Sequence, residues 1–314
     1  MTMTAATVSS DLRPELRRAL TVERLLYGVI VLAGLFLRFY QLGLQPLTPE
    51  EAAQSWPLWR AAQGLPVDGA APASASALLA ALQYALFWLT QGGDVIARLP
   101  AALAGSALLL VPWLLRPWLG RAPALTLALL LAIDPWLVAF SRIADGTMLA
   151  TLFALAVMTC LARFSVAEDA DADDDNGGRA WLYGSAVATG LLLVSGPLTW
   201  SYLIVLLLFA TLIIWPNLMP GARTLLQTQT GRLVLVAGIS ALLAATLWLA
   251  QPGGPAAIGR SLAEWGLQLR ANAYPIGWSA LRLLADQAWM VIFAIVGVGM
   301  LWRGRAALGW PRGH

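Results

Sequence analysis

The chain has 314 residues, 59% of them hydrophobic and 12% charged, and its formal net charge is +3. A mean hydropathy of +0.70 and apolar runs that approach the ~20 residues of a spanning helix indicate an all-α polytopic membrane protein. The single cysteine, Cys160, excludes a disulfide framework and a cysteine-based metal site. The single histidine, His314, excludes haem ligation and a histidine general base. Nothing in this composition predicts a nucleic-acid partner.

The chain begins with a polar, arginine-rich segment, residues 1–22, which predicts a cytoplasmic tail. The apolar run 24–40 follows. We expect it to be a retained signal anchor, because no small-residue cleavage site comes after it. A further apolar run, 74–89, is short and is interrupted by Gln83 and Tyr84. Its length and polar pair favour a helix that lies along the membrane surface over one that crosses it.

The remaining spans are predicted from long apolar runs. An acidic segment, 168–175, separates the early spans from the late ones and is expected to be a solvated loop. The run 181–215 is too long for one span, and Ser195-Gly196-Pro197 divides it into a hairpin of two. The other predicted spans cover residues 99–115, 122–140, 147–164, 233–250 and 288–302.

The arginine distribution decides the predicted topology. If 74–89 stays at the surface, about eight spans result, both termini are cytoplasmic, and the arginine-rich loops and tails all face the cytoplasm. A crossing at 74–89 would put several of these arginines outside, so we expect the eight-span arrangement in a plasma membrane. The expected parts are a transmembrane module at 23–302, external loops at 41–98 and 251–287, an acidic cytoplasmic loop at 165–180 and a cytoplasmic tail at 303–314.

Two adjacent carboxylates, Glu50 and Glu51, lie in the first external loop. Thr48 and Glu51 have the spacing of a capping box, with Pro49 at the first helical position. This pattern predicts a short helix, which Pro57 would bend or end. Capping accounts for Glu51, but it does not account for two carboxylates at a membrane surface, so a chemical role remains open beside the structural one.

A second polar group lies in the loop 140–147, which the eight-span arrangement places on the same face as the acidic pair. Asp145 is either a helix cap before Thr147 or part of a shared site. Arg142 is either an interfacial anchor or a member of that site. Asp134, inside the run 122–140, either lines a cavity or caps the helix that restarts at the following proline.

The order of these motifs resembles the GT-C membrane glycosyltransferases, and is closest to the protein mannosyltransferase and lipid A aminoarabinose transferase type. The resemblance covers residues 37–164, and the later spans only in hydropathy. It rests on the segments LRFYQLG and PLTPEEA at 37–52, ARLPAALAGSALLLVPWLL at 97–115, and DPWLVAFSRIADGTMLATLF at 134–153. In that family an Asp-Glu pair in the first external loop carries the chemistry, and Glu50 and Glu51 take those two places.

The resemblance implies transfer of a sugar from a polyprenyl-phosphate donor to an acceptor outside the membrane. A carboxylate takes the acceptor's proton, and Glu50 is the expected base. Glu51 is expected to orient the base, or to hold a divalent cation such as Mg²⁺ or Mn²⁺ together with Asp145. Arginines bind phosphate through their planar fork, and the candidates for the donor phosphate are Arg98, Arg142, Arg260 and Arg270.

The chain departs from the family pattern in three respects. Glu50 replaces the family's Asp, which moves the carboxylate by one methylene, and Ala71-Pro72-Ala73 replaces a His-Pro-Pro segment. The predicted spans also stop earlier than in many relatives. An alternative reading is therefore a non-catalytic GT-C-like subunit, or half of a split enzyme that acts with another membrane subunit.

Overall fold

The computed structural model describes residues 22–66, 75–170, 175–215, 220–246 and 256–271. The chain divides into two compact units, Met1–Trp265 and Gly266–His314. Of the second unit only the end of one helix is described, so the fold below is that of the first. The predicted tail at 303–314, the predicted span at 288–302 and all but Val22 of the predicted tail at 1–22 lie outside the described residues.

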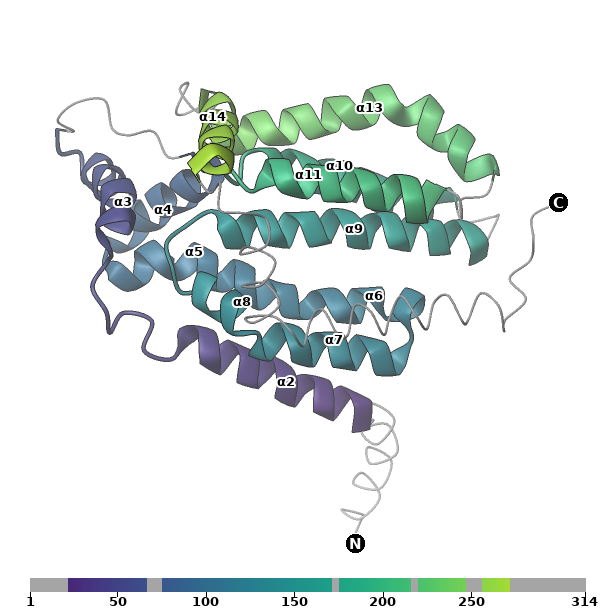
Figure 1. The fold of residues 1–314 in the computed structure, drawn as a ribbon, viewed down its shortest axis with the longest axis horizontal. Helices are drawn as coiled ribbons and strands as arrows, with labels where there is room; N and C mark the ends of the chain where they lie inside the picture. Colours follow the sequence, from purple (N-terminus) through teal and green to yellow (C-terminus); the bar gives the residue numbers. More distant parts are fainter. Residues whose placement is uncertain (1–21, 67–74, 171–174, 216–219, 247–255, 272–314) are drawn as a thin grey trace, which may run out of the picture. The chain divides into compact units, whose positions relative to one another are not determined.

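Most of the described residues are helical, and none of them lies in a strand. The long helices lie side by side, and each packs on the next (Figure 1). In spatial order they are α2 (Val22–Phe39), α7 (Arg121–Ile133), α6 (Val111–Leu119), α9 (Thr147–Ala170), α10 (Asp175–Leu193) and α13 (Pro220–Ala245).

The remaining helices extend or cover this bundle. A short 3-10 turn, Leu108–Leu110, joins α5 to α6. A π-helical turn, Ala210–Ile214, continues α11, which packs on α9. The helix α3 packs on α4, and α4 packs on α5. The bounds are Pro49–Ala62 for α3, Ala77–Thr90 for α4, Asp94–Ala107 for α5, Pro135–Phe140 for α8, Thr199–Phe209 for α11 and Ala256–Ala271 for α14.

Among the described residues, 3 helical segments are long and apolar enough to cross a membrane: Asp94–Pro117, Thr147–Ser165 and Leu226–Ala245. The helices Ala77–Thr90, Arg121–Ile133 and Thr199–Leu212 are apolar but shorter. The protein is therefore helical with membrane-spanning candidates, and the count of about eight spans stays a prediction.

One predicted boundary is confirmed, and one predicted span is divided. The long run divides at Ser195-Gly196-Pro197, because α10 ends at Leu193 and α11 begins at Thr199. The run 122–140 is instead two helices, α7 and α8, with the break at Asp134. There the Leu137 N–H donates to Asp134 Oδ1 at 2.7 Å, so the capping role predicted for Asp134 is confirmed.

Two other expectations are corrected in part. Of the two effects predicted for Pro57, bending or ending its helix, the second does not occur, since α3 continues to Ala62. The acidic segment 168–175 begins inside α9 and ends inside α10, with residues 171–174 outside the described part. The helix therefore extends into the segment that the charge run predicted to be a solvated loop.

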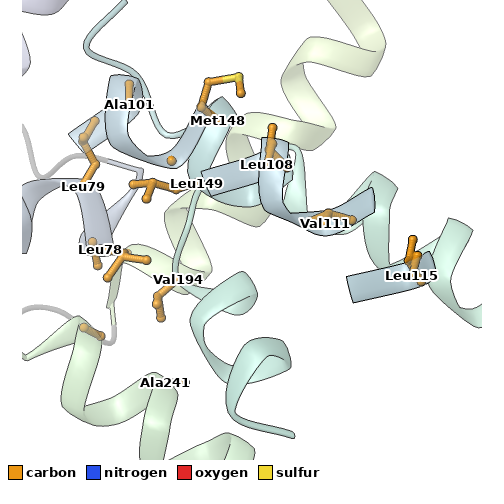
Figure 2. Close-up of a cluster of buried hydrophobic side chains, with 14 of the residues drawn as sticks. Leu78, Leu79, Ala101, Leu108, Val111, Leu115, Met148, Leu149, Val194 and Ala241 are labelled. Carbon is orange, nitrogen blue, oxygen red and sulfur yellow. The ribbon is translucent and has the colours of Figure 1, made fainter. Parts of the chain in front are cut away.

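The largest apolar cluster joins the early and late helices. It combines Leu78 and Leu79 of α4, Met148 and Leu149 of α9, and Val194 after α10. Ala241 of α13 and Ala257 of α14 belong to the same cluster, and Figure 2 shows how Val194 lies beside Leu78. A backbone hydrogen bond from the Leu78 N–H to the Val194 carbonyl, 3.0 Å long, ties the start of α4 to the α10–α11 connection.

Candidate functional site

Glu51 occupies the centre of a buried polar cluster. Its side chain completes the capping box, because Glu51 Oε2 accepts from the Thr48 N–H at 2.9 Å while Thr48 Oγ1 accepts from the Glu51 N–H at 3.3 Å. Oε1 accepts from the Ala144 N–H at 2.7 Å. Arg98 adds two parallel bonds, from Nε to Oε1 at 2.9 Å and from Nη2 to Oε2 at 2.8 Å. The predicted capping box is confirmed, and Glu51 is 3% exposed.

Every N–H group of the Arg98 guanidinium donates a hydrogen bond within the protein. Besides Glu51, it donates to the backbone carbonyls of Leu42, Gln45 and Pro46, at 2.8 to 3.1 Å. An arginine has five N–H donors, and all of them are engaged here. We call Glu51, Arg98, the N–H groups of Thr48 and Ala144 and these three carbonyls the Glu51–Arg98 cluster. Arg98 has no donor left for a phosphate, so the geometry gives it a structural role.

The surroundings of Glu51 keep its carboxylate ionised. Burial by itself would raise the pKa of Glu51, but hydrogen bonds from Arg98, Ala144 and Thr48 outweigh it and hold the pKa at about 2. A carboxylate with so low a pKa and both oxygens engaged is a poor proton acceptor near neutral pH. Its position suits a group that holds the loops in place.

Glu50 has the opposite environment. It is exposed in the first turn of α3, and among the described residues no hydrogen bond or ion pair engages its carboxylate. The neighbouring Glu51 is buried because successive residues of a helix point about 100° apart. The buried partner thus fixes the helix start while Glu50 stays accessible.

The loop between α8 and α9 meets the acidic pair, because Ala144 donates to Glu51. Asp145 serves as a cap for α9: its carboxylate accepts from the Thr147 hydroxyl and from the Thr147 N–H. Arg142 donates to the carbonyls of Leu37 and Tyr40 at 2.9 and 2.7 Å. These carbonyls lie at the end of α2, so Arg142 caps that helix and compensates its dipole.

The other two candidate arginines lie on α14. Arg260 is half-buried, its Nε is buried without a partner, and its guanidinium makes no hydrogen bond or ion pair with the described residues. Ala257, in the first turn of the same helix, packs in the same cluster as Leu78 and Leu79 of α4. Arg270 is exposed, in the last turn of α14, and belongs to the second unit.

Glu51 and Asp145 are not arranged as a metal site. In the part of the chain that the structure describes, no group of three or more His, Cys, Asp or Glu side chains is placed to hold a metal ion. The oxygens of Glu51 and of Asp145 accept hydrogen bonds from the protein instead. Within the described part of the chain, these carboxylates therefore offer no ready set of oxygen ligands for a divalent cation.

A comparison of the chain with protein-family models, with curated proteins and with solved structures finds no match. The site's own geometry is thus the basis for a functional assignment.

Some members of the site could not be found from the sequence. Ala144 contributes only its backbone N–H, which has no residue-type signal. Gln83 is 1% exposed, and its Nε2 donates to Ser55 Oγ at 3.1 Å and to the Ala97 carbonyl at 2.8 Å. It thereby joins α4 to α3 and α5. The sequence pattern had suggested that this glutamine marks the polar side of a surface helix.

Proposed function

We propose that the protein is a membrane glycosyltransferase that uses a polyprenyl-phosphate sugar as donor, with Glu50 as the base. The observation that carries the proposal is the difference between the environments of Glu50 and Glu51. Glu51 is buried and ion-paired, while Glu50 is exposed, unpartnered among the described residues and held on a fixed helix start. A base needs an accessible carboxylate in a defined position.

The proposed reaction is a displacement at the anomeric carbon. The acceptor hydroxyl or amine attacks that carbon, Glu50 takes the acceptor's proton, and the bond to the phosphate oxygen breaks. The departing polyprenyl phosphate takes the bonding electrons and needs a cation nearby. Arg260 fits this need best, because its guanidinium is not engaged by described residues, whereas Arg98 and Arg142 are engaged by carbonyls.

The experiment measures the rate at which the purified protein, in lipid nanodiscs, consumes a polyprenyl-phosphate sugar. We expect Glu50→Gln to lose ~10²–10⁴-fold in rate, the usual effect of removing a general base. Arg260→Ala is expected to weaken donor binding by about tenfold to a hundredfold, as for a lost charge-assisted hydrogen bond. Asp94→Asn, which neutralises another exposed carboxylate, is the matched control. A Glu50→Gln variant that keeps the parent rate would remove Glu50 from the chemistry.

A second candidate is a non-catalytic GT-C-like membrane subunit, or half of a split transferase. It is favoured by the number of candidate site residues that serve structure: Glu51, Arg98, Arg142 and Asp145 all have partners within the protein. Absence of transfer by the parent chain, together with co-purification of a second membrane protein that restores it, would support this candidate over the first.

A further inference from the structure

Arg38 is a completely buried arginine near the end of α2, with 0% of its surface exposed. Its Nη1 donates to the Gly34 carbonyl at 3.0 Å and to the Ala132 carbonyl at 3.4 Å, and its Nη2 donates to the Leu131 carbonyl at 2.8 Å. The last two carbonyls belong to the final turn of α7, which ends at Ile133. The cation thus lies at the negative end of that helix, where it is stabilised.

Asp134 occupies the break that follows. It is also 0% exposed, and its Oδ1 accepts from the Leu137 N–H at the positive end of α8. Its other oxygen, Oδ2, is buried and has no hydrogen-bond partner among the described residues, and the same holds for Arg38 Nε. The carbonyls of Leu131 and Ala132, which accept from Arg38, lie three and two residues before Asp134, so the two charges flank the same break. One buried cation and one buried anion therefore satisfy the two helix ends at a single break.

The space around the Arg38 guanidinium depends on glycines of two helices. A Cβ at Gly34 of α2 would lie 2.6 Å from Leu109 Cδ1 and 3.2 Å from Arg38 Nη1. A Cβ at Gly105 of α5 would lie 2.6 Å from Ser141 Cβ and 3.1 Å from Arg38 Nε. Both distances to carbon are shorter than packed side chains allow. The helices are therefore built closely around this arginine.

When two opposite charges are buried in an apolar bundle, loss of either one destabilises the folded protein. Removing one leaves the other buried and uncompensated, whereas removing both is often far less harmful. Ionisable groups inside helical membrane proteins also tend to face a partner with a defined role. Arg38 and Asp134 are not part of the Glu51–Arg98 cluster, so their role depends on the helices that they connect.

The two charges join the elements that lead into that cluster. Four residues after Arg38 the chain reaches Leu42, the first of the three carbonyls that bind Arg98. Beyond Asp134, the helix α8 leads into the loop that presents the Ala144 N–H to Glu51. Movement of α2 against the α7–α8 break would thus separate two sides of the cluster.

We propose that Arg38 and Asp134 are positioning residues: a mutually dependent charge pair that locks α2 to the α7–α8 break and so holds the Glu51–Arg98 cluster closed. Glu50 stands on the helix start that this cluster fixes. The pair therefore sets the position of Glu50 without contacting it. The proposal concerns the folded protein and holds whether or not the chain transfers a sugar.

The test is thiol labelling at two buried reporters in a Cys160→Ser background, which removes the only cysteine. Ala144→Cys reports on the cluster, and Ala186→Cys in α10 reports on general loosening; these alanines are 1% and 5% exposed. A membrane-permeant maleimide is applied to the parent, to Arg38→Met, to Asp134→Asn and to the double variant. The asparagine keeps the oxygen that caps α8 and removes only the charge.

We expect each single variant to raise labelling at position 144 by about tenfold or more, and the double variant to label more slowly than either, because it leaves no unpaired buried charge. Labelling at position 186 should stay at the parent rate. Arg116→Met is the matched control: it removes an arginine that pairs with Glu23 at the opposite end of α2, at 2.8 Å. This change should leave position 144 protected.

Three results would overturn the proposal. They are unchanged labelling at position 144, a parallel rise at positions 144 and 186, and a double variant whose effect equals the product of the single effects. If a single variant does not accumulate in the membrane, recovery of accumulation in the double variant supports the pair. Failure of the double variant as well would count against it.

Discussion

At the scale of single residues, the neighbours Glu50 and Glu51 have different roles because the helix turns them apart. Glu51 points into the protein, where Arg98 and backbone N–H groups enclose it, and Glu50 points outward. The two carboxylates are therefore expected to respond differently to amide substitution, although they are neighbours in the sequence.

The ion pair of Glu51 predicts acid lability. Its pKa is held at about 2 in the folded protein, against an ordinary value of 4.5. A lowered folded pKa contributes stability that is complete above the unfolded value and is lost as the pH falls from about 4.5 towards 2. The upper bound of this contribution is about 3 kcal/mol. Melting temperatures of the purified protein across this range would measure it.

The amide variants separate the two glutamates in this measurement. Glu51→Gln removes the titrating group, so its melting temperature should lie below that of the parent near neutral pH and approach it at low pH. Glu50→Gln is the control, and its curve should run parallel to that of the parent because the carboxylate is exposed and unpartnered among the described residues. A Glu51→Gln curve parallel to the parent at every pH would contradict this account.

At the scale of elements, α4 is held by polar contacts as well as by apolar packing. Gln83 projects from α4 and donates both to Ser55 of α3 and to the Ala97 carbonyl of α5. A buried amide in such a position specifies one arrangement of the three helices, because any sliding of α4 would leave donors and acceptors unpaired. The polar residue that interrupts this apolar run is thus part of the packing.

Gln83→Leu tests this arrangement. The leucine removes both hydrogen bonds and leaves the Ser55 hydroxyl and the Ala97 carbonyl buried without this partner. The expected loss is about 1–3 kcal/mol of unfolding free energy, or on the order of 2–10 °C in melting temperature. Tyr84→Phe is the matched control, since no partner among the described residues engages the Tyr84 hydroxyl. Equal melting temperatures for Gln83→Leu and the parent would show that the amide is dispensable.

At the scale of the whole molecule, two contacts hold the loop 141–146 at one end of the bundle: Arg142 donates to the Gln41 carbonyl of the loop 41–48, and the Ala144 N–H donates to Glu51 of α3. At the other end of α2, Arg116 and Glu23 pair beside the α6–α7 turn. The arginine distribution predicts that the first end faces outward and the second faces the cytoplasm.

Labelling of single cysteines in intact cells tests that orientation. In a Cys160→Ser background, Ala53→Cys on the exposed side of α3 and Ile143→Cys in the α8–α9 loop should react with an impermeant maleimide added outside. Arg121→Cys, at a side chain that is 80% exposed, should react only after the membrane is permeabilised. Reaction at position 121 in intact cells would invert the orientation, and would place the acidic pair in the cytoplasm.

Local signals in the sequence were sufficient for several features of the fold. The capping box at Thr48 and Glu51 and the hairpin division at Ser195-Gly196-Pro197 both depend on residues within a few positions of one another. Such contacts form wherever the chain adopts the local conformation, so residue type and spacing predict them. The helical, membrane-spanning class follows from composition for a similar reason, because apolar length is a property of a continuous segment.

The tertiary structure alone decided which charged residues serve the fold. Arg98 looked available for a phosphate, but it lies against Glu51, 47 positions earlier in the chain. Arg142 donates to a carbonyl at the end of α2, and Arg38 donates to a carbonyl at the end of α7. A guanidinium binds a carbonyl, a carboxylate or a phosphate with the same donors, so its residue type cannot reveal the partner. Only the packing of helices distant in sequence leaves Glu50 accessible and encloses Glu51.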